Sequence, residues 1–339
     1  MKIIVDAMGG DNAPEAIVRG GVLAAKKFGE DIVLVGQEDK VRAILKVDGT
    51  ENTPHLSVVH APDLVDMHDD PATVLRKKPD SSMAVALKMV QKGEGDAIVS
   101  AGSTGALLAG ATLFCKRIKG IRRGALAPVM PCAGGQVLLV DAGANTECTA
   151  EYLLQFAFMG SLYLQKLMGV AKPRVGLVNN GAEDSKGDPL RLEAYHLLKE
   201  AGDAGRLHFV GNVEGRDVPL GACDVAVCDG FAGNVMLKTI EGTAKFMSAE
   251  LKKVFLRSLG TKLGYLLVKG GLDDFRGLFD QDKIGGAPFL GIAYPVIKAH
   301  GSSNETAAMN AIRQAVEFTK SGLIDDITAN MEFMTIREK

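Results

Sequence analysis

The stretch Ala97-Ile-Val-Ser-Ala-Gly-Ser-Thr-Gly105 runs from a short apolar segment into a turn of small residues, and a helix-length apolar segment follows it. That order is typical of a strand, its loop and the next helix. Strand-length apolar runs alternate with periodic, helix-length segments along nearly the whole chain. The predicted strands cover residues 2–5, 32–35, 56–60, 97–100, 136–141, 174–178, 207–211, 225–228 and 294–297. The predicted helices cover residues 14–28, 40–47, 82–91, 105–116, 150–168, 189–200, 234–256 and 304–321.

The predicted strands are continuous Val, Ile and Leu runs, the pattern of strands that are buried on both faces. Their alternation with helices predicts an α/β fold in which helices cover both sides of a mostly parallel sheet. The loops that follow such strands lie at one edge of the sheet, where ligands bind in open α/β folds. The chain contains no repeat or Pro/Ser-rich linker, so we expect a single unit over residues 1–339.

Composition excludes several classes of protein. Among the 339 residues, 39 basic side chains face 41 acidic ones, and this balance argues against a general nucleic-acid binder. The five cysteines include no Cys-x-x-Cys pair, so we expect neither a disulfide framework nor a zinc ribbon, and no metal-ligand spacing occurs elsewhere. Asp6 comes too early for a signal peptide. The uncharged residues 97–115 contain a polar loop, so we expect a soluble cytoplasmic protein.

Six Gly-rich turns with polar side chains follow predicted strands, at residues 6–14, 100–105, 141–148, 179–187, 229–234 and 298–304. In the second turn, backbone N–H groups and two hydroxyls meet a helix start, which could form an anion cradle or simply cap the helix. In the fourth, Lys186 could face a phosphate or only solvent. In the sixth, His300 and the two serines after Gly301 could supply oxyanion donors and a proton carrier.

Motifs of other chemistries are missing. The sequence has no Walker A motif, no Gly-x-Gly-x-x-Gly, no His-Glu-x-x-His and no Gly-x-Ser-x-Gly. What remains is rich in anion-binding loops and poor in activated nucleophiles. That combination fits an enzyme whose substrate brings its own nucleophile.

Six segments in this order resemble the acyl-carrier-protein:phosphate acyltransferases of bacterial phospholipid synthesis. They are Val5-Asp-Ala-Met-Gly-Gly-Asp11, Ser100-Ala-Gly-Ser-Thr-Gly105, Val140-Asp-Ala-Gly-Ala-Asn145, Asn179-Asn-Gly-Ala-Glu-Asp-Ser-Lys-Gly187, Cys228-Asp-Gly-Phe-Ala-Gly-Asn234 and Lys298-Ala-His-Gly-Ser-Ser303. The resemblance implies conversion of a long-chain acyl-carrier thioester and inorganic phosphate into acyl phosphate and free carrier protein, without a cofactor. A membrane enzyme then uses the acyl phosphate to acylate glycerol 3-phosphate.

The same family looks like distant kin of the phosphotransacetylases. The resemblance therefore implies a three-layer α/β/α sandwich similar to the isocitrate and isopropylmalate dehydrogenases, and a homodimer. Phosphate is already an anionic nucleophile near neutral pH, so the enzyme must mainly hold it in line with the thioester carbonyl and stabilise the oxyanion.

Site residues follow from the matched segments. The predicted catalytic residues are His300, Ser302, Ser303 and Lys186, and which of the two serines is catalytic stays open. The predicted phosphate- and substrate-binding residues are Gly102, Ser103, Thr104, Gly105, Asn145, Asn179, Asn180, Asp229, Asn234 and Lys298. We expect the Gly102 loop, Lys186 and the asparagine turn to form one phosphate cradle.

Two surfaces could meet partners. The carrier protein is acidic, so a basic cluster is a candidate docking site, although such runs are often only solvated faces. The cluster consists of Lys116, Arg117, Lys119, Arg122 and Arg123, and residues 76–78 form a second candidate. The other surface is an amphipathic helical protrusion at residues 245–283, in which residues 251–269 form one helical stripe. Its candidate membrane contacts are Leu259, Leu263, Leu266 and Leu267; dimer packing could use part of the stripe.

Three alternatives stay open at this point. The first is a short-chain phosphotransacetylase that acts on acyl-CoA. The second is a nicotinamide-dependent decarboxylating dehydrogenase on the same fold, whose metal-binding aspartates and adenosine loop we do not find. The third is a non-catalytic scaffold that brings lipid enzymes to the membrane.

Overall fold

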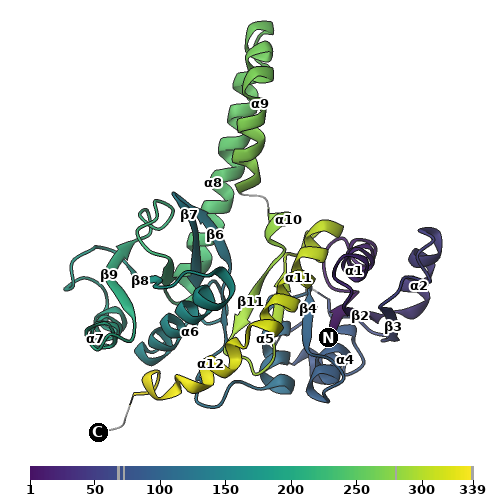
Figure 1. Cartoon of the computed structure of the whole chain (residues 1–339), viewed down its shortest axis with the longest axis horizontal. Coiled ribbons are helices and arrows are strands. Elements are labelled where there is room, and N and C mark those ends of the chain that lie inside the picture. Colours follow the sequence, from purple (N-terminus) through teal and green to yellow (C-terminus); the bar gives the residue numbers. More distant parts are fainter. Residues whose placement is uncertain (67–68, 72, 279–280, 337–339) are drawn as a thin grey trace.

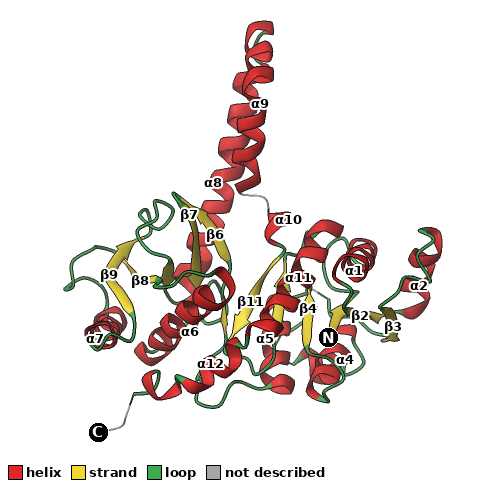
Figure 2. Ribbon diagram, in the orientation of Figure 1, coloured by secondary structure: helices red, strands yellow, loops and turns green. Residues whose placement is uncertain are grey.

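The strands of the computed structural model, which describes residues 1–66, 69–71, 73–278 and 281–336, form two sheets (Figure 2). The first has the order β3-β2-β1-β4-β12-β11-β5, with β1 (Lys2–Asp6), β2 (Asp31–Gly36), β3 (Leu56–His60), β4 (Ala97–Ser100), β5 (Ala125–Leu126), β11 (Gly286–Leu290) and β12 (Val296–Ala299). The second has the order β6-β7-β10-β8-β9, with β6 (Val129–Cys132), β7 (Gly135–Val140), β8 (Arg174–Asn179), β9 (His208–Glu214) and β10 (Val225–Val227). Neighbouring strands are parallel, except for the antiparallel pairs β11–β12, β11–β5 and β6–β7.

Helices cover both sheets and form a long projection (Figure 1). They are α1 (Glu15–Phe28), α2 (Glu38–Val47), α3 (Val74–Lys77), α4 (Ser82–Gln91), α5 (Thr104–Gly110), α6 (Ala150–Met168), α7 (Pro189–Asp203), α8 (Gly230–Leu256), α9 (Leu259–Leu278), α10 (Gln281–Ile284), α11 (Glu305–Ser321) and α12 (Leu323–Ala329). A π-helical turn, η1 (Ala111–Cys115), continues α5, and a 3₁₀ turn, η2 (Met331–Phe333), follows α12. The structure describes no helix that is long and apolar enough to cross a membrane.

Each sheet is the middle layer of a sandwich, because successive strand residues point to opposite faces. In β1, Ile3 packs in the cluster that contains α1 and α11, whereas Ile4 packs in the cluster that contains α4. In β7, Leu138 packs with α6, and Leu139 lies in the cluster that the base of α8 covers. The first of these clusters runs through both sheets by way of α6 and α11. The α/β/α class predicted from the sequence is confirmed.

Most predicted elements are present, with ends moved by a few residues. The prediction missed β5, β6 and β11, of which β6 and β11 contain Pro131 and Pro288. Proline removes a ladder donor and lowers strand propensity, and β6 tolerates it as the edge strand of its sheet. The helix predicted at residues 105–116 changes to π geometry after Gly110 and ends at Lys116, whose φ is +63°. The division of the strands between two sheets was not foreseen.

The amphipathic segment is a hairpin of two helices. The prediction of one continuous stripe over residues 251–269 is wrong, because the chain reverses at residues 257–258. The Ser258 hydroxyl accepts a bond from Thr261 N at 3.2 Å, and Thr261 Oγ1 accepts one from Ser258 N at 2.9 Å, which starts a new helix. Phe255 then packs edge-to-face on Tyr265, with ring centroids 5.5 Å apart. The projection therefore begins at the base of α8, inside the body of the molecule, and α8 and α9 lie side by side along it (Figure 1).

Candidate active site

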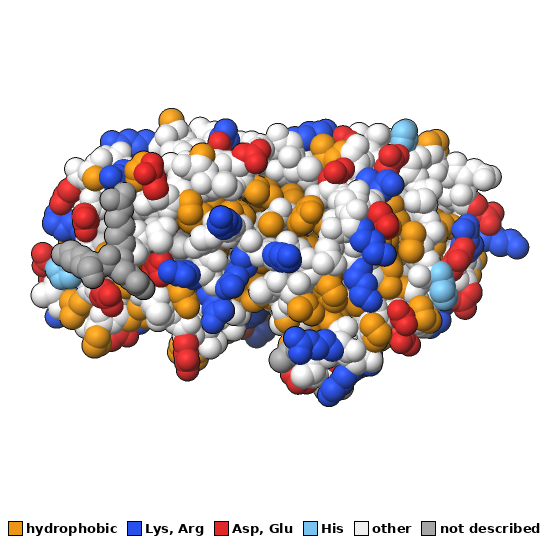
Figure 3. All heavy atoms as spheres, turned by 90° about the horizontal axis from the view of Figure 1, so that it is seen from below, with side chains coloured by type: hydrophobic (Ala, Val, Ile, Leu, Met, Phe, Trp, Pro, Cys, Tyr) orange, Lys and Arg blue, Asp and Glu red, His pale blue; other side chains and the backbone are white. Residues whose placement is uncertain are grey.

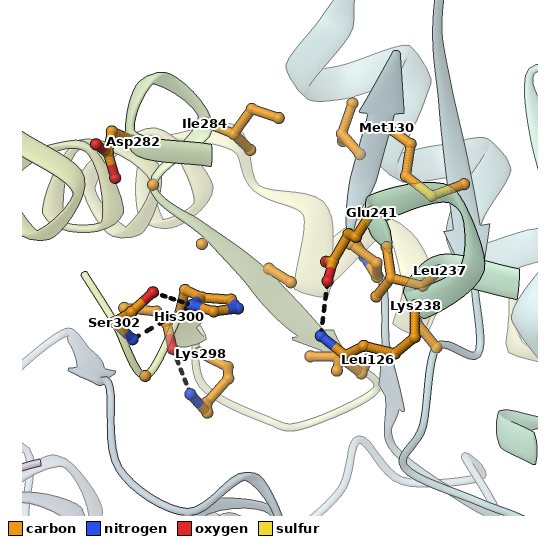
Figure 4. Close-up of a pocket in the computed structure, with 18 of the residues that line it drawn as sticks. Leu126, Met130, Leu237, Lys238, Glu241, Asp282, Ile284, Lys298, His300 and Ser302 are labelled. Atoms are coloured by element: carbon orange, nitrogen blue, oxygen red, sulfur yellow. Dashed lines mark hydrogen bonds and ion pairs between the residues drawn. The ribbon is translucent and has the colours of Figure 1, made fainter. Parts of the chain in front are cut away.

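A cavity of about 1160 Å³ lies between the two sheets at the base of the hairpin. Its polar end is built by the loop after β4, with Ala101 to Gly105, and by the residues from Lys298 to Ser302 at the end of β12. These two loops meet because β4 and β12 are parallel neighbours, with Ser100 opposite Lys298. The inner face of α8, the strand β6 and the α10–β11 junction supply the remaining walls (Figure 4).

His300 and Ser302 form a hydrogen-bonded pair at this polar end (Figure 4). His300 Nδ1 lies 2.8 Å from Ser302 Oγ and accepts a bond from the backbone N–H of Ser302 at 3.3 Å. A backbone N–H can only donate, so Nδ1 is unprotonated and the ring carries its proton on Nε2. Burial, with the nearby charge of Lys238, lowers the pKa of His300 below its usual value. The imidazole is therefore a neutral N–H donor near neutral pH.

Ser303, the other predicted catalytic serine, has a different place. Its side chain is buried, and its hydroxyl donates to the carbonyl oxygen of His300 at 2.7 Å. Asn12 Nδ2 donates to the backbone carbonyls of both serines, at 3.0 and 3.3 Å. Ser303 thus holds the turn, whereas Ser302 lines the cavity.

Lys298 is a buried lysine at the cavity wall, with its side chain beside His300 and Ser302 (Figure 4). Its ammonium donates to the carbonyl oxygens of Ala101, at 3.3 Å, and Ala299. Burial lowers the pKa of Lys298 to about 8, against the opposing effect of Asp6 and Asp11. The group is protonated at neutral pH, yet it has lost much of its hydration, and a bound anion would restabilise its charge.

The loop after β4 is held by a buried carboxylate that the prediction missed. Asp6 accepts hydrogen bonds from the hydroxyls of Ser82 and Ser100, both at 2.6 Å. Ser100 Oγ in turn accepts a bond from Gly102 N at 3.1 Å. A side chain on Gly9 would collide with Gly102 N and with the Asp6 carboxylate, so Gly9 permits this close approach. Burial raises the pKa of Asp6.

The predicted anion loop itself is partly used for capping. Ser103 Oγ accepts a bond from Ala106 N at 3.4 Å and so caps α5. Ala101 and the four residues predicted to bind phosphate, Gly102, Ser103, Thr104 and Gly105, line the cavity from this loop. The loop thus caps a helix, one of the two roles that the sequence left open, and it also faces the cavity.

A second buried carboxylate, Asp141, organises the loop after β7. Its oxygens accept bonds from the backbone N–H groups of Leu126, Gly143, Ala144 and Asn145 and from Asn145 Nδ2, at 2.7–3.2 Å. The Asn145 amide also donates to Gly124 O at 2.8 Å. Asn145 therefore fastens two loops together, and Gly143 and Asn234 are the neighbouring residues that line the cavity.

The remaining predicted residues gather at the edge of the second sheet. Asn179 Nδ2 donates to Lys186 O at 3.0 Å, and Asn179 Oδ1 accepts a bond from Asn180 N at 2.8 Å, so this turn is closed on itself. Asp229 caps α8 through Ala232 N at 2.9 Å and forms an ion pair with Arg191, which the prediction missed. Within the described residues, Lys186, Asn179, Asn180 and Asp229 lie outside the cavity lining. The structure does not bring them into one cradle with Gly102.

Further charged side chains line the cavity and were not predicted: Lys238, Glu241, Lys245, Asp273, Asp282 and Lys283. Lys238 and Glu241, one turn apart on α8, form an ion pair of 2.9 Å (Figure 4). Lys238 and Glu241 follow the Asn234 turn at helical spacing, and this spacing is the sequence signal that could have identified them. In the described part of the chain, no group of three His, Cys, Asp or Glu side chains is placed to hold a metal ion.

A neutral imidazole donor and a buried ammonium beside apolar walls form a site that suits a ligand with both anionic and apolar parts. The fold is shared with solved structures. A phosphotransacetylase from Streptococcus pyogenes superposes with a TM-score of 0.61 at 18% identity, over 96% of this chain and 94% of that one. A putative 4-hydroxythreonine-4-phosphate dehydrogenase from Salmonella typhimurium gives a TM-score of 0.51 at 14% identity, over 96% and 99% of the two chains. At these identities the likeness concerns the fold.

The family itself follows from closer relatives. The model of a family described as "Fatty acid synthesis protein" matches residues 1–326. A phosphate acyltransferase from Thermoanaerobacter pseudethanolicus is 47% identical over 335 residues, 98% of each chain. One from Clostridium acetobutylicum is 48% identical over 333 residues, 98% of this chain and 99% of that protein. The chain belongs to the phosphate acyltransferase family.

The function predicted from the sequence, a phosphate acyltransferase of lipid synthesis, is thereby confirmed. The short-chain phosphotransacetylase alternative is not favoured, because those enzymes share only the fold with this chain, at 16–18% identity.

Proposed function

We propose that His300, Ser302 and Lys298 carry out the transfer of a long-chain acyl group from an acyl-carrier thioester to inorganic phosphate. The observation that carries the assignment is the His300–Ser302 pair beside the buried Lys298, at the polar end of a cavity that is otherwise largely apolar. A phosphate oxygen attacks the thioester carbonyl carbon, the new C–O bond forms, and the C–S bond breaks. The products are an acyl phosphate and the carrier's thiol, which takes up the proton that the attacking hydrogen phosphate loses.

Lys298 and the Gly102–Gly105 loop bind the phosphate. The ammonium supplies a positive charge in a poorly hydrated place, where its attraction for an anion is stronger than in water. The start of the loop is held in position because Ser100 accepts a bond from Gly102 N and donates to Asp6. Positioning the nucleophile in this way supplies much of the rate enhancement, because phosphate needs no strong general base.

His300 donates its Nε2–H where negative charge develops, either on the carbonyl oxygen or on the departing sulfur. A fixed donor of this kind contributes about 10²–10³ in turnover. Ser302 orients the ring and adds a hydroxyl at the cavity surface. Lys186 lies apart from His300, Ser302 and Lys298, at the edge of the second sheet. We assign it to contacts with the carrier protein or with solvent rather than to the phosphate site.

The carrier protein docks on the basic cluster at residues 116–123. Lys116, Lys119, Arg122 and Arg123 are exposed, while Arg117 is half-buried and donates to Arg122 O. Arg122 also pairs with Glu151 at 3.1 Å, and Arg123 lies over the ring of Tyr152. Lys and Arg side chains are interspersed with apolar patches on the face opposite the hairpin (Figure 3). Such a surface suits an acidic partner.

The hairpin brings the enzyme to an anionic membrane. Leu259, Leu263, Leu266 and Leu267 expose 65–88% of their surface, far more than a folded chain normally leaves to water. Lys252, Lys253 and Lys262 accompany them and would meet lipid headgroups. There the acyl phosphate passes to a membrane glycerol-3-phosphate acyltransferase. A homodimer uses the remaining apolar surface of α8, including Phe246 and Met247, and the body of the enzyme stays in the cytoplasm.

The decisive assay supplies palmitoyl carrier protein and phosphate and traps acyl phosphate with hydroxylamine. We expect hydroxamate from the carrier thioester and none from acetyl-CoA in a parallel reaction. Product from acetyl-CoA alone would contradict the long-chain assignment, and no product from either thioester would overturn the reaction.

A further inference from the structure

One wall of the cavity is a stripe along the inner face of α8. Leu237, Ile240, Ala244 and Ser248 line the cavity from this helix, at the spacing of successive turns. All four are half-buried, whereas neighbouring residues such as Thr239 and Thr243 are exposed. The stripe leads from the site of His300 to the base of the projecting hairpin.

Apolar side chains also form other parts of the wall. Ile284 from α10 lies across the cavity from the stripe (Figure 4), whereas Val129 and Met130 from β6 line it beside α8, where Met130 shares a hydrophobic cluster with Leu237 and Ile240.

Among the charged residues that line this region, Lys245 and Lys283 are exposed and can extend to water, whereas Glu241 and Asp282 are half-buried. Glu241 is paired with Lys238 at 2.9 Å, and Asp282 accepts a bond from Asn304 Nδ2 at 2.5 Å. The apolar side chains of Leu237, Ile240 and Ile284 are then left to contact an apolar ligand.

We propose that this stripe is the acyl-chain site of the enzyme and that Ala244 sets the length of chain it accepts. The inference rests on the proposed function, because the thioester carbonyl is placed at His300. The chain then runs along α8, between Ile240 and Ile284, and its methyl end lies near Ala244 and Ser248.

The dimensions suit a membrane-lipid chain. From Asn234 to Ser248 the helix rises 14 residues, or about 21 Å at 1.5 Å per residue. One leaflet of a bilayer's hydrocarbon core is about 15 Å deep, which is the reach of such an acyl chain. The volume of about 1160 Å³ exceeds the upper end of ordinary small-ligand pockets, about 1,000 Å³. A short acyl group would leave most of this space to water.

The side chains along the stripe decrease in size away from His300, from Leu237 and Ile240 to Ala244 and Ser248. Gly277 of α9 lines the same far end, where a Cβ would come within 2.8 Å of Lys283 Nζ. The Lys283 ammonium therefore lies against Gly277, and Ala244 and Ser248 are the small residues of α8 at this end. This end lies where the hairpin begins to expose Phe246, Met247 and Leu278, so the chain end points toward the apolar surface of the projection.

The test compares Ala244→Phe with wild type on octanoyl, dodecanoyl and palmitoyl carrier thioesters. A single methylene in an apolar pocket changes kcat/KM about tenfold or more, so a blocked end should lower palmitoyl kcat/KM at least about 100-fold. Octanoyl kcat/KM should stay near that of wild type. Thr243→Phe, which adds the same ring on the exposed face one residue away, should leave all three values unchanged.

Ser248→Phe gives a second, independent measurement should Ala244→Phe unfold. It should lower palmitoyl transfer and spare dodecanoyl transfer, because it blocks the groove one turn farther out. An equal loss for all chain lengths, or no change in a variant with wild-type thermal stability, would overturn the acyl-chain site. Absence of acyl phosphate from wild type with every thioester would instead overturn the proposed function, so the two failures are distinct.

Discussion

The backbone N–H of Ser302 donates to Nδ1 of His300 at 3.3 Å, and this single bond fixes which ring nitrogen carries the proton. Nε2–H is left to act as a donor toward the cavity. Because the bond comes from the backbone, the tautomer survives the loss of the Ser302 side chain. The two residues can therefore be separated by mutation.

We predict that His300→Ala lowers kcat about 10²-fold or more, since a donor to developing negative charge is removed. Ser302→Ala should cost less, because the backbone bond that orients the ring persists. Ser303→Ala is the control within the same turn: its hydroxyl holds the His300 carbonyl, so the variant should lose thermal stability with little change in kcat. Initial rates of hydroxamate formation measure all three. A larger loss of kcat in Ser303→Ala than in Ser302→Ala would contradict the assignment.

The pH dependence of kcat/KM for phosphate should reflect the ionisation of the Lys298 ammonium. Its pKa is lowered to about 8, so the charged form prevails below pH 8 and is lost as pH rises through that value. We expect kcat/KM for phosphate to fall above about pH 8. The lowered pKa of His300 keeps the imidazole neutral throughout this range, so this residue adds no loss there.

Lys298→Arg is the matched variant, because guanidinium keeps its charge throughout this range. The ionisation of phosphate itself is common to both proteins and cancels in the comparison. The basic limb should move to higher pH in the variant. An identical basic limb in both proteins would show that another group is responsible.

Much of the fold could be predicted from the sequence, because strands buried on both faces are continuous apolar runs. The Gly-rich polar turns after them are equally easy to recognise. Which strand belongs to which sheet could not be predicted from the sequence. Ser100 and Lys298 lie nearly 200 positions apart, yet they are register partners across β4 and β12, whereas Asn179 ends a strand of the other sheet. Both sheets carry the same apolar pattern, so sequence alone placed all six loops at one rim.

The sequence analysis did not identify the two carboxylates that position the loops, for a related reason. Asp6 and Asp141 each follow a buried strand within a Val-Asp-Ala sequence, and this shared signal could have singled them out. Their roles, however, depend on Ser82 and on backbone N–H groups from other loops. Such partners are defined by packing and not by spacing along the chain.

Asp6 offers a test of this positioning. Asp6→Ala leaves the buried hydroxyls of Ser82 and Ser100 without their acceptor, and an unsatisfied buried group costs about 1–3 kcal/mol. We expect that loss in the free energy of unfolding by urea, with a raised KM for phosphate because Gly102 is no longer held through Ser100. Asp6→Asn keeps one acceptor and should lose less. Unchanged stability in Asp6→Ala would contradict the role of Asp6.

The hairpin should bind anionic vesicles through its exposed leucines. Leu263→Glu together with Leu267→Glu places two negative charges on the apolar stripe of α9, so we predict loss of flotation with vesicles rich in anionic lipid. Thr239→Glu with Thr243→Glu carries the same charge change on exposed polar positions of α8 and should still float. Retained flotation of the leucine variant would exclude this stripe as the membrane contact.

The basic cluster should control the encounter with the carrier. Arg122→Glu with Arg123→Glu reverses two exposed charges, and we expect KM for the carrier thioester to rise about tenfold with kcat preserved, since rim charges act mainly on association. Arg76→Glu with Lys77→Glu is the matched control, because it makes the same change in net charge at the other basic run. A larger effect of the control would move the docking site to residues 76–78. The difference from wild type should shrink as salt is added, and at 1 M, where screening acts within about 3 Å, the two enzymes should converge.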